Sequence, residues 1–168
     1  LYREEVPSRG EVVVDGIRVD TLRRGRVPKL RRNIGVVFQD FKLLSHKTVW
    51  ENVAFALQVT GTRTRDVMRM VPRALDLVGL SHKSRMFPSE LSGGEQQRTA
   101  IARALVGNPK ILLCDEPTGH LDSDTAGRVL DLIEQTQERH QFTLVIATHD
   151  ADVAARLDRR VELLDGRI

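Results

Sequence analysis

The chain has 168 residues, of which 40% are hydrophobic and 29% are charged, and these proportions fit one globular domain with its own core. Its single cysteine, Cys114, excludes an internal disulfide framework. No apolar run approaches the roughly 20 residues of a membrane-spanning helix. The formal net charge is +3, and much of the positive charge lies between residues 18 and 32.

This basic stretch contains Arg18, Arg23, Arg24, Arg26, Lys29, Arg31 and Arg32. It fits a solvated surface first, contact with anionic lipid headgroups second and contact with nucleic acid third. Aromatic residues make up only 4% of the chain, which argues against stacking on single-stranded bases. We therefore expect no nucleic-acid partner and keep anionic lipid as the alternative to a solvated face.

The first third of the chain predicts a hairpin, a short helix and a strand. Residues 11–19 contain an Asp-Gly turn between two short apolar runs, which indicates a β-hairpin. Residues 28–32 predict a short helix. The continuous apolar run of residues 34–38 is typical of a strand buried on both faces, and it leads directly into Gln39.

A helical region follows. Residues 48–59 predict a helix that begins with a capping box formed by Thr48 and Glu51. Apolar residues keep helical spacing from 67 to 79, and we expect Pro72 to kink or restart that helix.

Residues 91–98 read Leu-Ser-Gly-Gly-Glu-Gln-Gln-Arg. Ser92 and Glu95 match a capping box, so a helix is expected to begin here and to end with Gly107 as its C-cap. A Gly-rich turn that opens a helix offers backbone N–H groups to a phosphate. A flexible turn with an ordinary cap would give the same pattern.

The last part alternates strands and helices. Residues 111–114 and 143–148 predict buried strands, residues 123–140 predict the helix between them, and residues 161–164 predict an edge strand followed by a turn at 165–167. This alternation indicates an α/β fold with a mostly parallel sheet. Such sheets carry their active sites at the carboxyl ends of the strands.

Polar side chains stand at those carboxyl ends: Gln39, Asp115, Glu116 and His149. Phosphoryl transfer to water needs charge neutralisation, a positioned water and a group that accepts its proton. An acidic pair at a strand end can hold and use a metal-bound phosphate. The acidic pair could also cap the following loop, and His149 alone would fit a satisfied surface histidine.

In their order along the chain, these features resemble the motifs of the ATP-binding cassette (ABC) ATPases. Residues 91–98 resemble the signature, Asp115-Glu116 the Walker B motif, residues 119–122 the D-loop and His149 the switch histidine. The resemblance implies a P-loop NTPase-like α/β core. It further implies that residues 1–168 form one partial ABC ATPase domain with a helical subdomain inserted at about 45–107.

The resemblance also implies roles for these residues. Asp115 and Gln39 would hold Mg²⁺, and Gln39 would also reach the attacking water. Glu116 would orient or deprotonate this water, and His149 would contact the terminal phosphate of ATP.

The signature of one ABC subunit closes over the ATP of a second subunit, so function implies a dimer. Ser92, Gly93, Gly94 and Glu95 would serve the partner's ATP, where a helix N-terminus adds about half a positive charge. Asp122 belongs to the D-loop-like segment, in which His120 stands where the closest relatives commonly have Asn.

The phosphate-binding pattern G-x-x-x-x-G-K-[ST] is not in the sequence. Residues 1–5 resemble the tail of the helix that follows such a loop. We therefore expect a fragment of a longer ATPase, inactive alone, with N-terminal strands and the P-loop missing. A non-catalytic regulatory relative is the alternative.

Residues 31–44 and 48–54 look most like the cell-division ATP-binding (FtsE) family, which implies an integral membrane partner of the FtsX type. The expected location is peripheral, on the cytoplasmic face of the bacterial plasma membrane. The nearest competitor is the lipoprotein- or macrolide-export ATPase group. Chromosome-maintenance ATPases of the SMC or Rad50 kind insert a long coiled coil, and no sustained heptads lie between Gln39 and Leu91.

Overall fold

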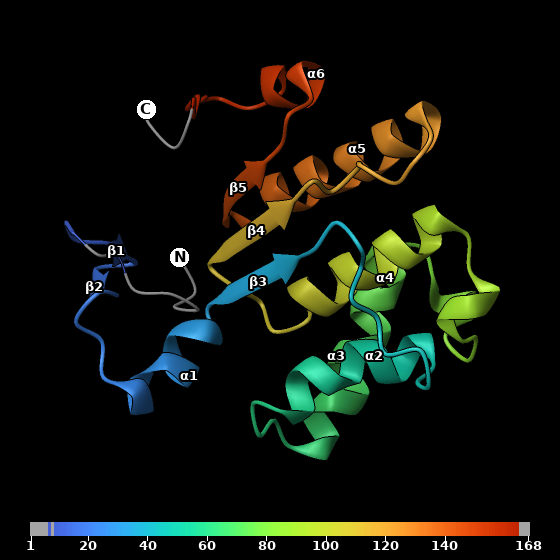
Figure 1. Ribbon diagram of the computed structural model, residues 1–168. Helices are drawn as coiled ribbons and strands as arrows, with labels where there is room; N and C mark the ends of the chain where they lie inside the picture. Colours follow the sequence, from blue (N-terminus) through green and yellow to red (C-terminus); the bar gives the residue numbers. More distant parts are fainter. Residues whose placement is uncertain (1–6, 8, 165–168) are drawn as a thin grey trace.

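The computed structural model describes residue 7 and residues 9–164 (Figure 1). Its first elements are β1 (Val13–Val14), β2 (Ile17–Arg18), a 3-10 helix η1 (Arg24–Arg26) and α1 (Val27–Arg31). β1 and β2 pair antiparallel, which confirms the predicted hairpin. Asp15 and Gly16 both have positive φ, 50° and 73°, as a two-residue hairpin turn requires.

The central sheet contains β3 (Ile34–Val37), β4 (Ile111–Asp115) and β5 (Thr143–Ala147), in the order β3-β4-β5. Both pairings are parallel, as the strand and helix alternation predicts. Asp115 lies opposite Ala147 in the register. The carboxyl ends of the strands therefore meet at one edge, where the predicted polar side chains follow.

The remaining α-helices are α2 (Val49–Gln58), α3 (Thr64–Leu77), α4 (Gly93–Leu105), α5 (Ser123–His140) and the short α6 (Ala151–Ala155). Two 3-10 turns, η2 (Ser81–Lys83) and η3 (Pro88–Glu90), connect α3 to α4. α2, α3 and α4 pack against one another. The capping box of Thr48 and Glu51 is formed at the start of α2, as predicted.

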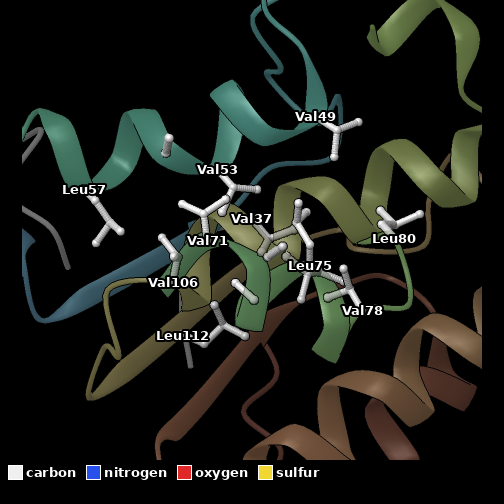
Figure 2. Packing of buried hydrophobic residues seen from close by; sticks show 14 of the residues in the cluster. Val37, Val49, Val53, Leu57, Val71, Leu75, Val78, Leu80, Val106 and Leu112 are labelled. Atoms are coloured by element: carbon white, nitrogen blue, oxygen red, sulfur yellow. The ribbon is translucent and has the colours of Figure 1, made fainter. Parts of the chain in front are cut away.

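One face of the sheet is covered by helices. Val37, Leu112 and Cys114 point into a core that continues through α4 and α5 to the buried residues of α2 and α3 (Figure 2). Val37 and Leu112 are fully buried. Burying an aliphatic side chain of this size contributes about 1.5 to 3 kcal/mol, so this core holds the helical region on the sheet.

The opposite face is covered only in part. A second cluster of Val14, Val19, Leu30 and Ile34 packs the hairpin and α1 against it. Along β5 the burial alternates, and Val145 is 40% exposed. The prediction that residues 143–148 form a buried strand is therefore wrong for one face of β5, where Thr143, Val145 and Ala147 are exposed.

Two helix predictions need correction. α3 runs through Pro72 as one helix and does not restart there, because Pro72 lies on the exposed side, where water can satisfy the carbonyl that its missing N–H leaves free. The C-cap of α4 is Val106 rather than Gly107. The left-handed residue that turns the chain after α4 is Asn108, with φ 52°.

The predicted C-terminal edge strand is also wrong. Residues 161–163 have no regular structure and Leu164 forms an isolated bridge. The predictions for residues 1–5 and 165–167 lie outside the described residues. Among the helices that the structure describes, none is both long and apolar enough to cross a membrane.

Candidate active site

The site begins where β4 ends. Glu116 follows Asp115 in a left-handed conformation, with φ 45°. Its N–H donates to the carbonyl of Ala147 on β5, at 2.9 Å. A non-glycine residue held at positive φ is uncommon and concentrates at functional sites. This turn places the Glu116 side chain over the carboxyl ends of β4 and β5.

The Glu116 carboxylate accepts three hydrogen bonds from Thr148 and His149, the two residues that follow β5. Oε1 accepts from the ring Nδ1 of His149 at 2.6 Å and from the His149 backbone N–H at 2.9 Å. Oε2 accepts from the hydroxyl of Thr148 at 3.1 Å. Burial opposes ionisation of this carboxyl, but these bonds together hold the pKa of Glu116 below its ordinary value. Glu116 is therefore an anion at neutral pH.

This contact fixes which ring nitrogen of His149 faces Glu116. An ionised carboxylate only accepts, so Nδ1 of His149 must carry a proton and donate it. The other nitrogen, Nε2, is then free for another group. The His149 side chain is 84% exposed, so it can reach a ligand outside the sheet.

Gln39 lies beside the same turn. A Cβ built on Gly119 would lie 3.0 Å from Nε2 of Gln39 and 3.5 Å from Cβ of Glu116. The Gln39 amide therefore lies against the backbone that follows Glu116, and a side chain at residue 119 would press on it. Nδ1 of His120 lies 3.0 Å from the Gln39 carbonyl oxygen, and the rings of Phe41 and His120 meet edge to face. The structure thus brings Gln39, Glu116 and His149 together.

Asp115 is the exposed last residue of β4, and its carboxylate makes no hydrogen bond or ion pair with the described residues. Carboxylate and amide oxygens suit Mg²⁺, which commonly takes one or two protein ligands and completes its shell with phosphate and water oxygens. Within residues 9–164, no cluster of three or more His, Cys, Asp or Glu could hold a metal. The oxygen atoms of Asp115 and Gln39 are of the kind that could hold a magnesium ion together with phosphate and water oxygens.

The Gly-rich segment forms a separate cluster. The capping box is present: the Glu95 N–H donates to Oγ of Ser92 at 3.4 Å, and the Ser92 N–H donates to Oε2 of Glu95 at 3.0 Å. Lys83 Nζ lies 2.6 Å from Oε1 of Glu95. The Lys83 ammonium and the Ser92 N–H lower the pKa of Glu95 to about 2.

Two glycines let α4 begin close to the start of α5. A Cβ on Gly93 would touch the side chain of Leu121 at 3.4 Å, and one on Gly94 would collide with the methyl group of Thr125. Asp122 caps α5, because its Oδ1 accepts from the Thr125 N–H at 3.0 Å, and this bond lowers the pKa of Asp122. No described contact joins Ser92 or Gly93 to Glu116.

Sequence reasoning missed two polar residues on α4. Gln97 is fully buried, and its Nε2 donates to the carbonyl of Pro117 at 2.5 Å, directly after Glu116. Arg103 donates to the carbonyls of Phe41 and Lys42, directly after Gln39. In the sequence, these residues could be recognised only as polar side chains on the inward face of an amphipathic helix. That pattern does not identify the group to which such a side chain bonds.

Comparison with known proteins agrees with this geometry. Residues 1–119 match the sequence profile of the family described as "ABC transporter". The cell division ATP-binding protein FtsE of Mycobacterium tuberculosis is 52% identical over 169 residues, which cover 100% of this chain and 73% of that protein. The methionine import ATP-binding protein MetN of Aliivibrio fischeri is 44% identical over 96% of this chain and 47% of its own length.

The fold has solved counterparts. A dimeric ATP-binding cassette, MJ0796, bound to ADP and phosphate in a post-hydrolysis state, superposes with a TM-score of 0.87 at 36% identity, covering 99% of this chain and 74% of that one. The parallel sheet and its helices therefore have the fold of an ATP-binding cassette. The chain belongs to the ABC transporter ATPase family, whose full-length members bind and hydrolyse ATP.

Proposed function

We propose that this chain carries the water-activating half of an ATP-hydrolysis site, in a full-length cassette that acts with a membrane subunit in cell division. The observation that carries the chemical part is the Glu116 carboxylate. It stands at the carboxyl edge of the sheet, is ionised at neutral pH and is held by His149 and Thr148. A fixed anion of this kind orients a water and accepts its proton.

The neighbouring groups bind the metal ion, the attacking water and the terminal phosphate. Asp115 and the Gln39 amide would hold Mg²⁺, which would supply positive charge to the phosphates. Gln39 lies next to the Glu116 turn and so also reaches the attacking water. Nε2 of His149 is directed away from the carboxylate and contacts the terminal phosphate.

The start of α4 serves a second nucleotide. Ser92, Gly93 and Gly94 present the N-terminus of a 13-residue helix, and none of them contacts the Glu116 cluster in the described structure. A helix N-terminus favours an anion because of its free N–H groups and its dipole. This separation supports a homodimer in which the signature of one subunit, with Glu95 as its cap, faces the ATP of the other.

Cell division is the finer part of the proposal. The most similar relatives by this comparison include cell division ATP-binding proteins at 46% to 52% identity over the whole chain. An FtsX-like integral membrane subunit is the corresponding partner, which places the protein peripherally on the cytoplasmic face of the membrane. The basic stretch of residues 18–32 suits anionic lipid at that surface.

The MetN relatives favour a second candidate, a cassette that drives solute import. Depletion of the full-length protein from its host separates the two. We expect long cells that fail to divide, with normal methionine uptake, and copurification of an FtsX-like membrane protein. Normal division with lost methionine uptake would instead assign the protein to the import group.

Complementation links the phenotype to the site. A plasmid copy with Glu116→Gln should fail to restore division. Glu138→Gln makes the same chemical change on an exposed side chain of α5 and should restore it fully. Restoration by both variants would mean that the cellular function does not depend on hydrolysis at Glu116.

A further inference from the structure

The loop that follows Gln39 has an unusual backbone. Phe41 and Lys42 are consecutive non-glycine residues in the left-handed region, with φ of 60° and 48°. Side chains of L-amino acids rarely adopt this region, and two in succession are rarer. Such a conformation persists only where surrounding contacts determine it.

Arg103 supplies those contacts from α4. Its Nη1 donates to the Lys42 carbonyl at 2.5 Å and its Nη2 donates to the Phe41 carbonyl at 2.7 Å. The planar guanidinium thus hydrogen-bonds to both left-handed residues through two donors with fixed geometry. Lysine, with one ammonium, cannot reproduce this fork.

The charge of Arg103 depends on its hydrogen bonds to this loop. Arg103 is half-buried, burial lowers the pKa of its guanidinium, and no carboxylate pairs with it among the described residues. A cation removed from water without a counter-ion depends on its hydrogen-bond acceptors. The two loop carbonyls are the acceptors that the structure shows, so the charge and the loop conformation stabilise each other.

The loop is also held from its other side. His120 contacts the Gln39 carbonyl oxygen at 3.0 Å, and its ring meets Phe41 edge to face. Residues 39–42 are therefore held at one end by His120, from the segment after Glu116, and at the other end by Arg103 of α4. The N-terminus of α4 is the signature segment, about 15 Å from Arg103 at 1.5 Å per residue along the helix.

We propose that Arg103 is a positioning residue that ties the Gln39 loop to the signature helix. The inference rests on the proposed role of Gln39 at the Mg²⁺ and the water. Through the carbonyls of Phe41 and Lys42, Arg103 keeps the Gln39 amide beside Glu116 when α4 is in place. A shift of α4 would then move the loop that follows Gln39, and with it the Gln39 side chain.

A double-mutant cycle in the full-length protein tests this. Arg103→Met keeps the length of the side chain and removes the fork. We expect kcat to fall about 10- to 100-fold, because small displacements of catalytic groups have effects of this size, while the KM for ATP changes little. In a Gln39→Ala background the same change should alter kcat by about twofold at most, because the group that Arg103 positions is gone. The Mg²⁺ concentration that gives half-maximal activity should rise in both single variants.

Arg139→Met, at an exposed arginine of α5, is the matched control and should leave kcat unchanged. An equal fractional loss of kcat with and without Gln39, or a normal kcat in Arg103→Met, would overturn the proposal. If Arg103→Met does not fold, Arg103→Lys takes its place in the cycle, because it keeps the charge and the stem. If Gln39→Ala has normal kcat and Mg²⁺ dependence, the proposed role of Gln39 fails, which is a different outcome from a failure of Arg103 alone.

Discussion

At the scale of single residues, the site depends on how each charge is satisfied. Hydrogen bonds from His149 and Thr148 lower the pKa of Glu116, and the Lys83 ammonium and the Ser92 N–H lower that of Glu95. The first carboxylate is positioned for chemistry, and the second closes the cap of α4. The two glutamates therefore have different roles, because different groups donate hydrogen bonds to their carboxylates.

Glu95 gives a pH-dependent prediction. Its pKa is lowered from 4.5 to about 2 on folding, so its contribution to stability is fully present above pH 4.5 and is lost as the pH falls toward about 2. Glu95→Gln keeps a side chain that can cap the helix but loses the ion pair with Lys83. In the full-length protein we expect a loss of about 1 kcal/mol at pH 7, since the pair is partly exposed, and a smaller loss at pH 3.

Urea unfolding at the two pH values measures this difference. Glu138→Gln, at an exposed carboxylate, should have no effect at either pH. A loss from Glu95→Gln that grows as the pH falls would contradict the assignment of the ion pair as the source of its stabilisation.

At the scale of elements, the close approach of β3 to α4 is set by a glycine. A Cβ on Gly35 would lie 2.6 Å from the Ala104 backbone carbonyl and 3.1 Å from Leu112 Cδ1. Neither a backbone atom of a helix nor a fully buried leucine can move away cheaply. α4 therefore carries Arg103 and Gln97 toward the site only because residue 35 has no side chain.

Gly35→Ala should destabilise the full-length protein by about 1 to 3 kcal/mol, the usual cost of overpacking a core. Gly127→Ala on α5 is the matched control, since its new methyl group would meet nothing within 4 Å. That variant should be more stable by about 0.5 to 1 kcal/mol, because alanine is the better helix former. Thermal unfolding of both variants measures these changes in stability. A Gly35→Ala variant as stable as the unchanged protein would show that β3 and α4 can move apart to accept a side chain.

The sequence predicts elements well where a local rule decides. The two capping boxes and the Asp-Gly hairpin turn are confirmed because each depends on neighbouring residues. The position of Gln39, Glu116 and His149 at one edge follows from the topology of parallel strands. The contacts of Gln97 and Arg103 could not be predicted, since they join residues 20 and about 60 positions apart.

At the scale of the whole molecule, the chain holds the candidate residues of an ATP-hydrolysis site at one edge of its sheet. G-x-x-x-x-G-K-[ST] is not in its sequence, and β5 exposes one face. The exposure of β5 could not be predicted, because its apolar run looks the same whether or not a further element covers it.

The 168-residue chain alone should therefore bind ATP about a thousandfold or more weakly than the full-length protein. A P-loop contributes several charge-assisted hydrogen bonds of about 1.5 to 3 kcal/mol each, and three of them account for this factor. Calorimetric titration of both proteins with MgATP measures it. Micromolar binding by the 168-residue chain would contradict this expectation.

The central claim is that Glu116 activates the water that attacks ATP. The most direct measurement is the steady-state rate of ATP hydrolysis by full-length Glu116→Gln, together with an ATP-binding isotherm of the same preparation. We predict a fall in kcat of about 100-fold or more with little change in affinity for ATP, because the amide cannot accept the proton but fills the same space. A variant that binds ATP and turns it over at the normal rate would contradict the account.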